Sequence, residues 1–264
     1  MKPSDVLPAA RWRGGASEPF SREVPEETPV ALVHDATTTA VMMATPADLE
    51  DFGIGFSLTE RIVARRDEIT AVECVAEGSG IEIRMWLAGE PSAALAARRR
   101  TLAGPTGCGL CGIDSLAEAT RPPPAVGRGM TIAPTAIHEA FAALSQAQRL
   151  GAATRAAHAA GWWVEGEGLV ALREDVGRHN ALDKLVGALA RGGGPRGDGL
   201  LVLTSRVSVE MIQKAAVLGA QVVAAISAPT TLAVRTAQAC GLTLVAVARD
   251  DGFEVFTGHE RIVG

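Results

Sequence analysis

Hydrophobic and polar positions follow two periods along the second half of the chain. Short apolar runs alternate there with segments in which apolar residues recur every three or four positions. The expected strands are 155–163, 168–173, 200–204, 221–227, 242–248 and 253–257. The expected helices are 134–149, 177–191, 209–219 and 229–240. Strands that alternate with helices predict an α/β domain of three layers, with helices on both faces of a sheet.

The first half has a different pattern and predicts a smaller α+β part. Residues 28–44 indicate two strands around the turn at His34, and residues 69–87 indicate a hairpin. Between them, Thr45 is the expected N-cap of a helix, with Pro46 at its first position. Residues 1–27 are rich in proline, glycine and charge, which predicts a flexible N-terminus.

The proline-rich stretch after Arg121 is typical of a linker. The predicted elements before and after this stretch differ in kind, so we expect a domain boundary near it. Together with the N-terminus, this boundary divides the chain into three units. They are a flexible N-terminus at 1–27, an N-terminal α+β part at 28–125, and an α/β domain at 126–264.

Composition and charge narrow the function. The formal net charge of −5 argues against general nucleic-acid binding, which needs clustered lysine and arginine. We find no basic stretch followed by an apolar segment at the start, and no apolar run long enough to span a membrane. The expected location is therefore the cytoplasm, without a membrane or a nucleic acid as partner.

The candidate chemistry lies at Cys108 and Cys111, which form the one closely spaced cysteine pair. Glycines and a proline surround the pair, which predicts an exposed loop, and the arginines at 98–100 would lower a thiol pKa. A lone pair of this spacing is compatible with catalysis, redox chemistry or half of a metal site. The other two cysteines, Cys74 and Cys240, are expected to be buried and inert.

A zinc deaminase is the sharpest rival interpretation of this pair. That chemistry needs a third ligand from a histidine followed two residues later by glutamate. None of the five histidines has glutamate at that position. The sequence therefore argues against a deaminase, and no metal ligand is assigned.

Polar residues gather where the expected strands of the α/β domain end. These clusters are 173–180, 204–206, 227–230 and 249–251. Ligands of α/β sheets bind at the carboxyl ends of strands, so the clusters favour a nucleotide-like ligand. The cluster at 173–180 has two interpretations, a ligand or dimer contact and a solvated loop in which Asp175 caps the next helix.

The segments 107–112, 174–184 and 227–234 follow one another in a characteristic order, with a weaker match at 60–62, and the end of the chain from 255 to 262 also fits. In these segments and in their order the chain resembles the formate dehydrogenase accessory sulfurtransferases. The resemblance extends over roughly residues 28–262. It implies a cytidine-deaminase-like fold without the deaminase zinc site, and a homodimer.

The resemblance also implies a function and its partners. A cysteine desulfurase would pass a persulfide sulfur to Cys108, and Cys111 would resolve the persulfide or assist its release. The sulfur would then reach the molybdenum of Mo-bis(molybdopterin guanine dinucleotide), which the formate dehydrogenase apoenzyme requires. A GDP-like nucleotide would mimic part of that cofactor. Two alternatives stay open, a non-catalytic chaperone for the cofactor and a metal-binding or redox protein.

The resemblance places the cofactor contacts in one segment at the end of the chain. Its residues are Val247, Ala248, Arg249, Asp250, Asp251 and Gly252. The cofactor carries pyrophosphates, and an acidic protein needs local arginines and helix N-termini to hold them. We therefore add Arg178, His179, Arg206 and Ser227 as candidate contacts, since they follow the expected strands.

Overall fold

The protein is described by a computed structural model that covers residues 1–89, 121–195 and 197–264. Six strands form a mixed sheet in the order β12–β11–β10–β9–β7–β8. Their bounds are β7 His158–Val164, β8 Gly168–Asp175, β9 Leu200–Leu203, β10 Val222–Ala225, β11 Thr243–Arg249 and β12 Gly252–Thr257. The central strands β9, β10 and β11 are parallel, whereas β7 and β12 run antiparallel to their neighbours β9 and β11.

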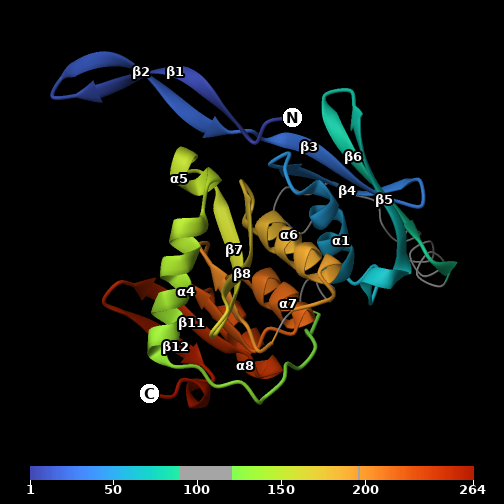
Figure 1. The fold of residues 1–264 in the computed structure, drawn as a ribbon, viewed down its shortest axis with the longest axis vertical. Helices are drawn as coiled ribbons and strands as arrows, with labels where there is room; N and C mark the ends of the chain where they lie inside the picture. Colours follow the sequence, from blue (N-terminus) through green and yellow to red (C-terminus); the bar gives the residue numbers. More distant parts are fainter. Residues whose placement is uncertain (90–120, 196) are drawn as a thin grey trace.

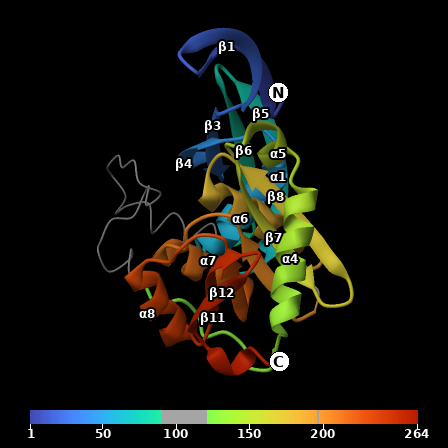
Figure 2. The same ribbon diagram turned by 90° about the vertical axis from the view of Figure 1, so that its left-hand side faces the viewer.

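Helices cover both faces of this sheet, as Figure 2 shows. One face is covered by α6 (Arg178–Arg191), α7 (Val209–Leu218) and α8 (Thr231–Cys240), and the other by α4 (Pro134–Ala147). Along β9, Leu201 and Leu203 belong to the first core, while Leu200 and Val202 pack in the core under α4. A strand that is buried on both faces reads as a continuous apolar run, as β9 does. The predicted α/β class and its three layers are therefore confirmed.

A second sheet, in the order β4–β3–β6–β5, forms the N-terminal part. Its strands are β3 Thr28–His34, β4 Thr37–Ala44, β5 Ile69–Glu77 and β6 Gly80–Leu87. Helix α1 (Leu49–Thr59) packs its apolar side chains, Phe52 and Ile54 among them, against the inner face of this sheet. Short helices complete the described chain, namely α5 Leu150–Thr154, η1 Arg66–Glu68 and η3 His259–Arg261.

Two glycines let α1 lie directly against α6. A Cβ atom on Gly55 would come within 1.7 Å of the carbonyl oxygen of Asp183. A Cβ atom on Gly187 would lie 1.9 Å from the carbonyl oxygen of Asp51. Both contacts are far inside van der Waals distance, so a larger residue at either glycine would separate the two helices. The N-terminal part is thus packed onto the α/β domain through this helix pair.

Residues 4–25 form a hairpin, which differs from the flexible N-terminus predicted by their composition. Strands β1 (Ser4–Arg13) and β2 (Ala16–Pro25) pair along their whole length, from Ser4 opposite Pro25 to Arg13 opposite Ala16. The turn consists of Gly14 and Gly15, whose φ angles are +56° and +83°. Glycine adopts such angles readily, and two of them make a tight hairpin turn. Figure 1 shows this hairpin, here called the arm, projecting from the body.

No helix among the residues that the structure describes is both long enough and apolar enough to cross a membrane.

Candidate functional site

The predicted site residues outside the cysteine pair meet at one edge of the six-stranded sheet. Strands β8, β9, β10 and β11 end at this edge, and β7 begins there because His158 pairs with Asp175. Arg178 and His179 follow β8, Arg206 follows β9, and Ser227 follows β10. The carboxyl edge of an α/β sheet is the usual position of a ligand site.

Cationic side chains that follow two of these strands gather on this edge, beside His158 at the start of β7. Burial lowers the pKa of His158, and the neighbouring guanidinium groups of Arg178 and Arg206 lower it further, against the opposing effect of Asp175. Arg178 and Arg206 therefore lie close enough to His158 for their positive charges to act on it. The Nε atom of Arg178 is buried and has no hydrogen-bond partner. Such a group is available to an anionic ligand.

His179, the second residue of α6, is held in its neutral form. Burial lowers its pKa to about 4, and the positive charges of Arg178 and Lys214 act in the same direction, while Glu210 and Glu60 oppose them. Its Nε2 atom is buried and has no hydrogen-bond partner. A neutral imidazole with one free ring nitrogen offers a ligand either a donor or an acceptor.

A buried polar network holds the start of α6 in place. The carboxylate of Asp175 accepts hydrogen bonds from Lys184 Nζ at 2.6 Å, from Gly177 N at 2.7 Å and from Asn180 Nδ2 at 3.0 Å. It also accepts one from the backbone of Thr45, at 3.0 Å. Asp175 is therefore more than a solvated helix cap, because it ties the N-terminal part to the segment that carries Arg178 and His179.

The expectation that Thr45 caps a helix is wrong. Helix α1 begins at Leu49, its N-cap is Asp48 in the left-handed conformation, and Pro46 lies before the helix. The hydroxyl of Thr45 instead accepts a hydrogen bond from the backbone of Val176, at 3.1 Å. The residue thus follows the pattern of a local cap, but a partner 131 positions away engages its side chain.

Val247 introduces a distortion into the segment expected to contact the cofactor. Its φ angle is +53°, and the register of β11 with β12 shifts between Ala246 and Arg249. A β-branched residue is strained in this region of backbone space, and such strain concentrates at functional sites. A bulge of this kind turns the following side chains in a new direction. Here those side chains belong to Arg249, Asp250 and Asp251.

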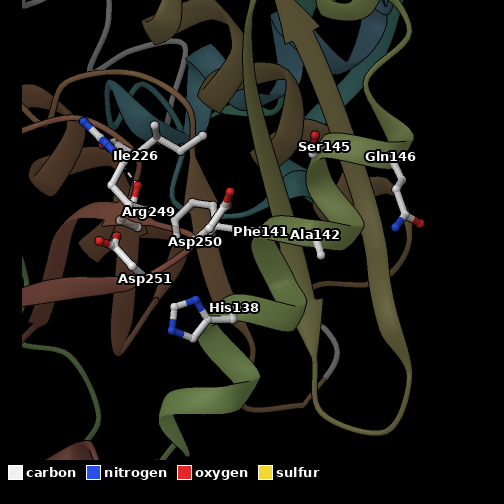
Figure 3. A pocket seen from close by; sticks show the side chains of 10 residues that line it. His138, Phe141, Ala142, Ser145, Gln146, Ile226, Arg249, Asp250 and Asp251 are labelled. Atoms are coloured by element: carbon white, nitrogen blue, oxygen red, sulfur yellow. Dashed lines mark hydrogen bonds between the residues drawn. The ribbon is translucent and has the colours of Figure 1, made fainter.

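A cavity of about 1000 Å³ opens beside this segment. Arg249, Asp250 and Asp251 line one side of it, together with Ile226 at the end of β10 (Figure 3). The opposite side belongs to α4 and is formed by His138, Phe141, Ala142, Ser145 and Gln146. The volume matches the upper range of small-molecule sites.

The guanidinium of Arg249 is oriented by backbone carbonyls at the mouth of this cavity. Its Nη1 atom donates to the carbonyl oxygens of Ile226 and Ala248, the latter at 2.7 Å. Arg249 thus lines the cavity, whereas Arg178 and Arg206 form the cationic cluster farther along the same edge. The sequence places all three arginines at strand ends. The structure divides them between the cavity and the neighbouring cationic cluster.

The α4 side of the cavity was missed by the sequence analysis. His138, Phe141 and Gln146 lie within the expected helix 134–149 and belong to no motif. The histidine ring lies 5.6 Å from the ring of Phe253, between ring centroids. The only available signal was the presence of histidine and glutamine on a helix that packs on the sheet.

A second buried network lies where α1 ends beside α7. Lys214 Nζ binds both carboxylate oxygens of Asp183, at 2.9 and 3.1 Å, and also Glu60 Oε1 at 2.8 Å. Burial raises the pKa of Asp183 to about 6 against the opposing effect of Lys214. Burial alone would lower the pKa of Lys214, but Asp183 and Glu60 raise it. The lysine is therefore charged at neutral pH.

The cysteines divide into three cases. Cys108 and Cys111 lie outside the described residues. Cys240 is buried, as predicted, but Cys74 is exposed, and the prediction that it is buried is wrong. Cys74 lies on β5, which is an edge strand of its sheet. Burial of part of the side chain raises the pKa of its thiol to about 11, so the exposed Cys74 is a poor nucleophile.

Within residues 1–89, 121–195 and 197–264, no group of three histidine, cysteine or acidic side chains is placed to hold a metal ion. The fold and the edge define a three-layer α/β protein with a cationic cluster and a large cavity at the carboxyl ends of its strands. The model of the FdhD/NarQ family matches residues 25–263. The chain belongs to this family.

Named relatives agree with the family assignment. The chain is 58% identical over 260 residues to the sulfur carrier protein FdhD of Brucella abortus, covering 98% of this chain and 96% of the relative. It is 51% identical to the protein of the same name from Agrobacterium fabrum, covering 95% and 93%. A similar crystal structure is that of a protein from Desulfotalea psychrophila described as a formate dehydrogenase accessory protein. It is 25% identical, covers 98% of this chain and 99% of its own, and has a TM-score of 0.75.

Proposed function

We propose that this chain is a sulfur carrier for the maturation of formate dehydrogenase. The names of its relatives support this role, as does the description of the similar crystal structure. The observation that carries the proposal within the described chain is the convergence of Arg178, Arg206 and the 247–252 segment on one sheet edge. A carrier needs such a place to hold the anionic recipient of its sulfur.

The sulfur is proposed to travel on Cys108. Its thiolate attacks the terminal sulfur of a persulfide on a cysteine desulfurase, forms a persulfide on Cys108, and releases the desulfurase cysteine as a thiolate. Delivery as sulfide takes two electrons. Cys111 forms a disulfide with Cys108, and the two cysteines thereby supply these electrons. An external dithiol then reduces the disulfide. Since only a thiolate attacks efficiently, the reaction favours a cysteine of low pKa, unlike Cys74.

The proposed recipient is Mo-bis(molybdopterin guanine dinucleotide), here a substrate of sulfur transfer. Its pyrophosphates suit the guanidinium groups of Arg178 and Arg206, which lie beside the N-terminus of α6. Its guanine dinucleotide ends suit a large cavity with aromatic and carboxylate groups, such as Phe141, Asp250 and Asp251 provide. Carboxylates accept hydrogen bonds from the N–H groups of guanine. Ser227 follows Ile226 in the chain and Gly252 follows Asp251, so both are proposed as further contacts.

The remaining partners are proposed with this role. They are a cysteine desulfurase as sulfur donor, the formate dehydrogenase apoenzyme as client, and a second copy of the chain in a homodimer. The corresponding compartment is the cytoplasm, where reducing conditions keep a cysteine pair available for sulfur chemistry.

Cells that lack their own carrier test the proposal through formate dehydrogenase activity. The wild-type chain should restore activity, and the Cys108→Ala variant should abolish it. The Cys74→Ala variant is the matched control, because Cys74 is exposed yet its raised pKa makes it a poor nucleophile. Full activity of Cys108→Ala together with bound GDP would favour a non-catalytic cofactor chaperone. Stoichiometric zinc in freshly purified protein would favour a metal-binding role for the pair.

A further inference from the structure

Another cavity, of about 290 Å³, lies at the base of the arm and is here called the arm-base cavity. Three segments that are distant in the sequence form its walls. They are the arm near Ser4 and Glu23, the turn before α1, and α5 together with the end of β8. Figure 1 shows α5 beside the base of the arm. No residue lines both this cavity and the one beside Arg249, so the two are separate.

Hydrogen bonds between the segments hold the walls of the arm-base cavity in place. On the arm side, Arg22 donates to the carbonyl of Thr154 at the end of α5, at 3.2 Å. On the other side, the carboxylate of Glu174 accepts hydrogen bonds from the backbone N–H groups of residues 149–151, at 2.7 and 2.9 Å. Both oxygens of Glu174 are therefore engaged within the protein, and the start of α5 is fixed against β8.

Two other carboxylates that line the cavity retain the capacity to bind a cation. Glu23 accepts a hydrogen bond from Ser4 Oγ at 2.6 Å, and no cationic partner binds it among the described residues. Asp48 lies 3.5 Å from Arg173 Nε, but this guanidinium is closer to Asp51, at 2.7 Å. Carboxylates in this state attract an ammonium group, which donates charge-assisted hydrogen bonds to them.

The remaining lining supplies a cation and an apolar surface. Arg149 lines the cavity, and its guanidinium has no partner in the part of the chain that the structure describes. A guanidinium binds a carboxylate through two parallel hydrogen bonds. Leu150, Ala153 and Leu172 provide the apolar part of the wall. The cavity thus combines groups of both charges with an apolar surface in a small volume.

We propose that the arm-base cavity binds a free α-amino acid with an apolar side chain. The ammonium group of the ligand donates to Glu23 and Asp48, and its carboxylate accepts from Arg149. The apolar side chain packs against Leu150 and Leu172. The volume is at the lower end of the range for small-molecule sites, which suits a ligand of this size.

The mixture of charges favours a zwitterion over simpler ligands. A metal ion would leave the guanidinium of Arg149 without a counter-charge. A phosphate would be repelled by the carboxylates of Glu23 and Asp48. An amino acid presents an ammonium and a carboxylate on one carbon atom, so it satisfies both signs at once.

Calorimetric titration of the full-length chain with L-leucine tests the proposal. The wild type should bind L-leucine one-to-one and at least about tenfold more tightly than two analogues. Isoamylamine lacks the carboxylate of leucine, and isocaproate lacks its ammonium group. These comparisons use the wild-type protein and do not depend on the folding of a variant. The absence of saturable binding, or equally tight binding of either analogue, would overturn the proposal.

Substitutions locate the binding in the arm-base cavity. Glu23→Gln and Arg149→Ala should each weaken the binding of L-leucine by about tenfold. Glu18→Gln is the matched control for the first, because Glu18 is exposed on the arm and does not line the cavity. Arg128→Ala is the control for the second for the same reasons. Circular dichroism shows whether each variant is folded, and unchanged affinity in both cavity variants would contradict the site.

Hydrogen exchange gives a second readout, because Glu23 belongs to the arm while Arg149 precedes α5. A ligand held by both should slow the exchange of backbone amides at the base of the arm and in α5. The slowing should be smaller in Glu23→Gln at the same concentration of L-leucine. Unchanged exchange in saturated wild-type protein would place the amino acid elsewhere and overturn the proposal. None of these measurements depends on sulfur transfer by Cys108.

Discussion

The Nζ atom of Lys184 and the Oδ2 atom of Asp175 lie 2.6 Å apart, and both side chains are completely buried. The ammonium also donates to the carbonyl of Thr45, at 2.8 Å. This pair therefore joins three segments, namely the turn before α1, the end of β8 and the body of α6. It fixes the backbone from which Arg178 and His179 extend.

Replacement of Lys184 by methionine should destabilise the protein by about 3–5 kcal/mol, because it leaves the Asp175 carboxylate buried and unpaired. Urea unfolding of the two proteins measures the difference. Arg65→Ala is the control, since the Arg65–Asp67 pair is exposed on both sides and its loss should leave the urea midpoint unchanged. A similar midpoint for Lys184→Met and wild type would contradict this role of the pair.

Gly55→Ala should be strongly destabilising through overpacking, by about 3 kcal/mol or more. The added methyl group would meet the carbonyl of Asp183 and force α1 away from α6. Gly129→Ala provides the comparison, because a Cβ atom there meets nothing within 4 Å. Thermal unfolding of both variants checks the prediction, and equal melting temperatures would show that the helix contact is more adaptable than its geometry indicates.

His179 should make the protein less stable in acid. Its folded-state pKa of about 4 lies below the ordinary histidine value of 6.5, so the unfolded chain binds this proton more tightly between those values. The stabilisation is complete above pH 6.5 and is lost as the pH falls through about 4. Between about pH 7 and about pH 4.5, His179→Gln should lose roughly 2 kcal/mol less stability than wild type. Parallel pH slopes for the two proteins would contradict a buried neutral imidazole.

Arg178→Ala and Arg206→Ala should each weaken GDP binding by about tenfold, as removal of a charge-assisted hydrogen bond to a phosphate predicts. Calorimetric titration with GDP measures the effect. Arg235→Ala on α8 is the control, because this arginine is exposed and was assigned no ligand. Unchanged affinity in both edge variants would remove the cationic cluster from the proposed site.

Periodicity was sufficient for the α/β domain because its strands are buried on both faces. Leu200 to Leu203 read as a continuous apolar run, and the intervening helices show a clear three-to-four spacing. The parallel arrangement of these strands also brought the candidate ligand residues to one edge of the sheet. Polar residues placed after parallel strands necessarily lie side by side there.

Local patterns failed where distant partners decided the structure. Thr45 has the sequence features of an N-cap, but its backbone and side chain bind residues near position 175. Lys184 and Lys214 follow helical periods in which a charged residue normally faces water, yet each has a carboxylate partner in the interior. The Gly14–Gly15 turn was a recognisable hairpin signal, but the charged composition around it outweighed that signal.

The measurement closest to the central claim is the mass of the intact protein after incubation with a cysteine desulfurase and cysteine. The account predicts the addition of one sulfur atom, removable by a thiol reductant, and a labelled peptide that contains Cys108. The addition should persist in Cys74→Ala and Cys240→Ala and disappear in Cys108→Ala. A sulfur that remains on the Cys108→Ala protein, or wild-type protein that gains none, would contradict the account.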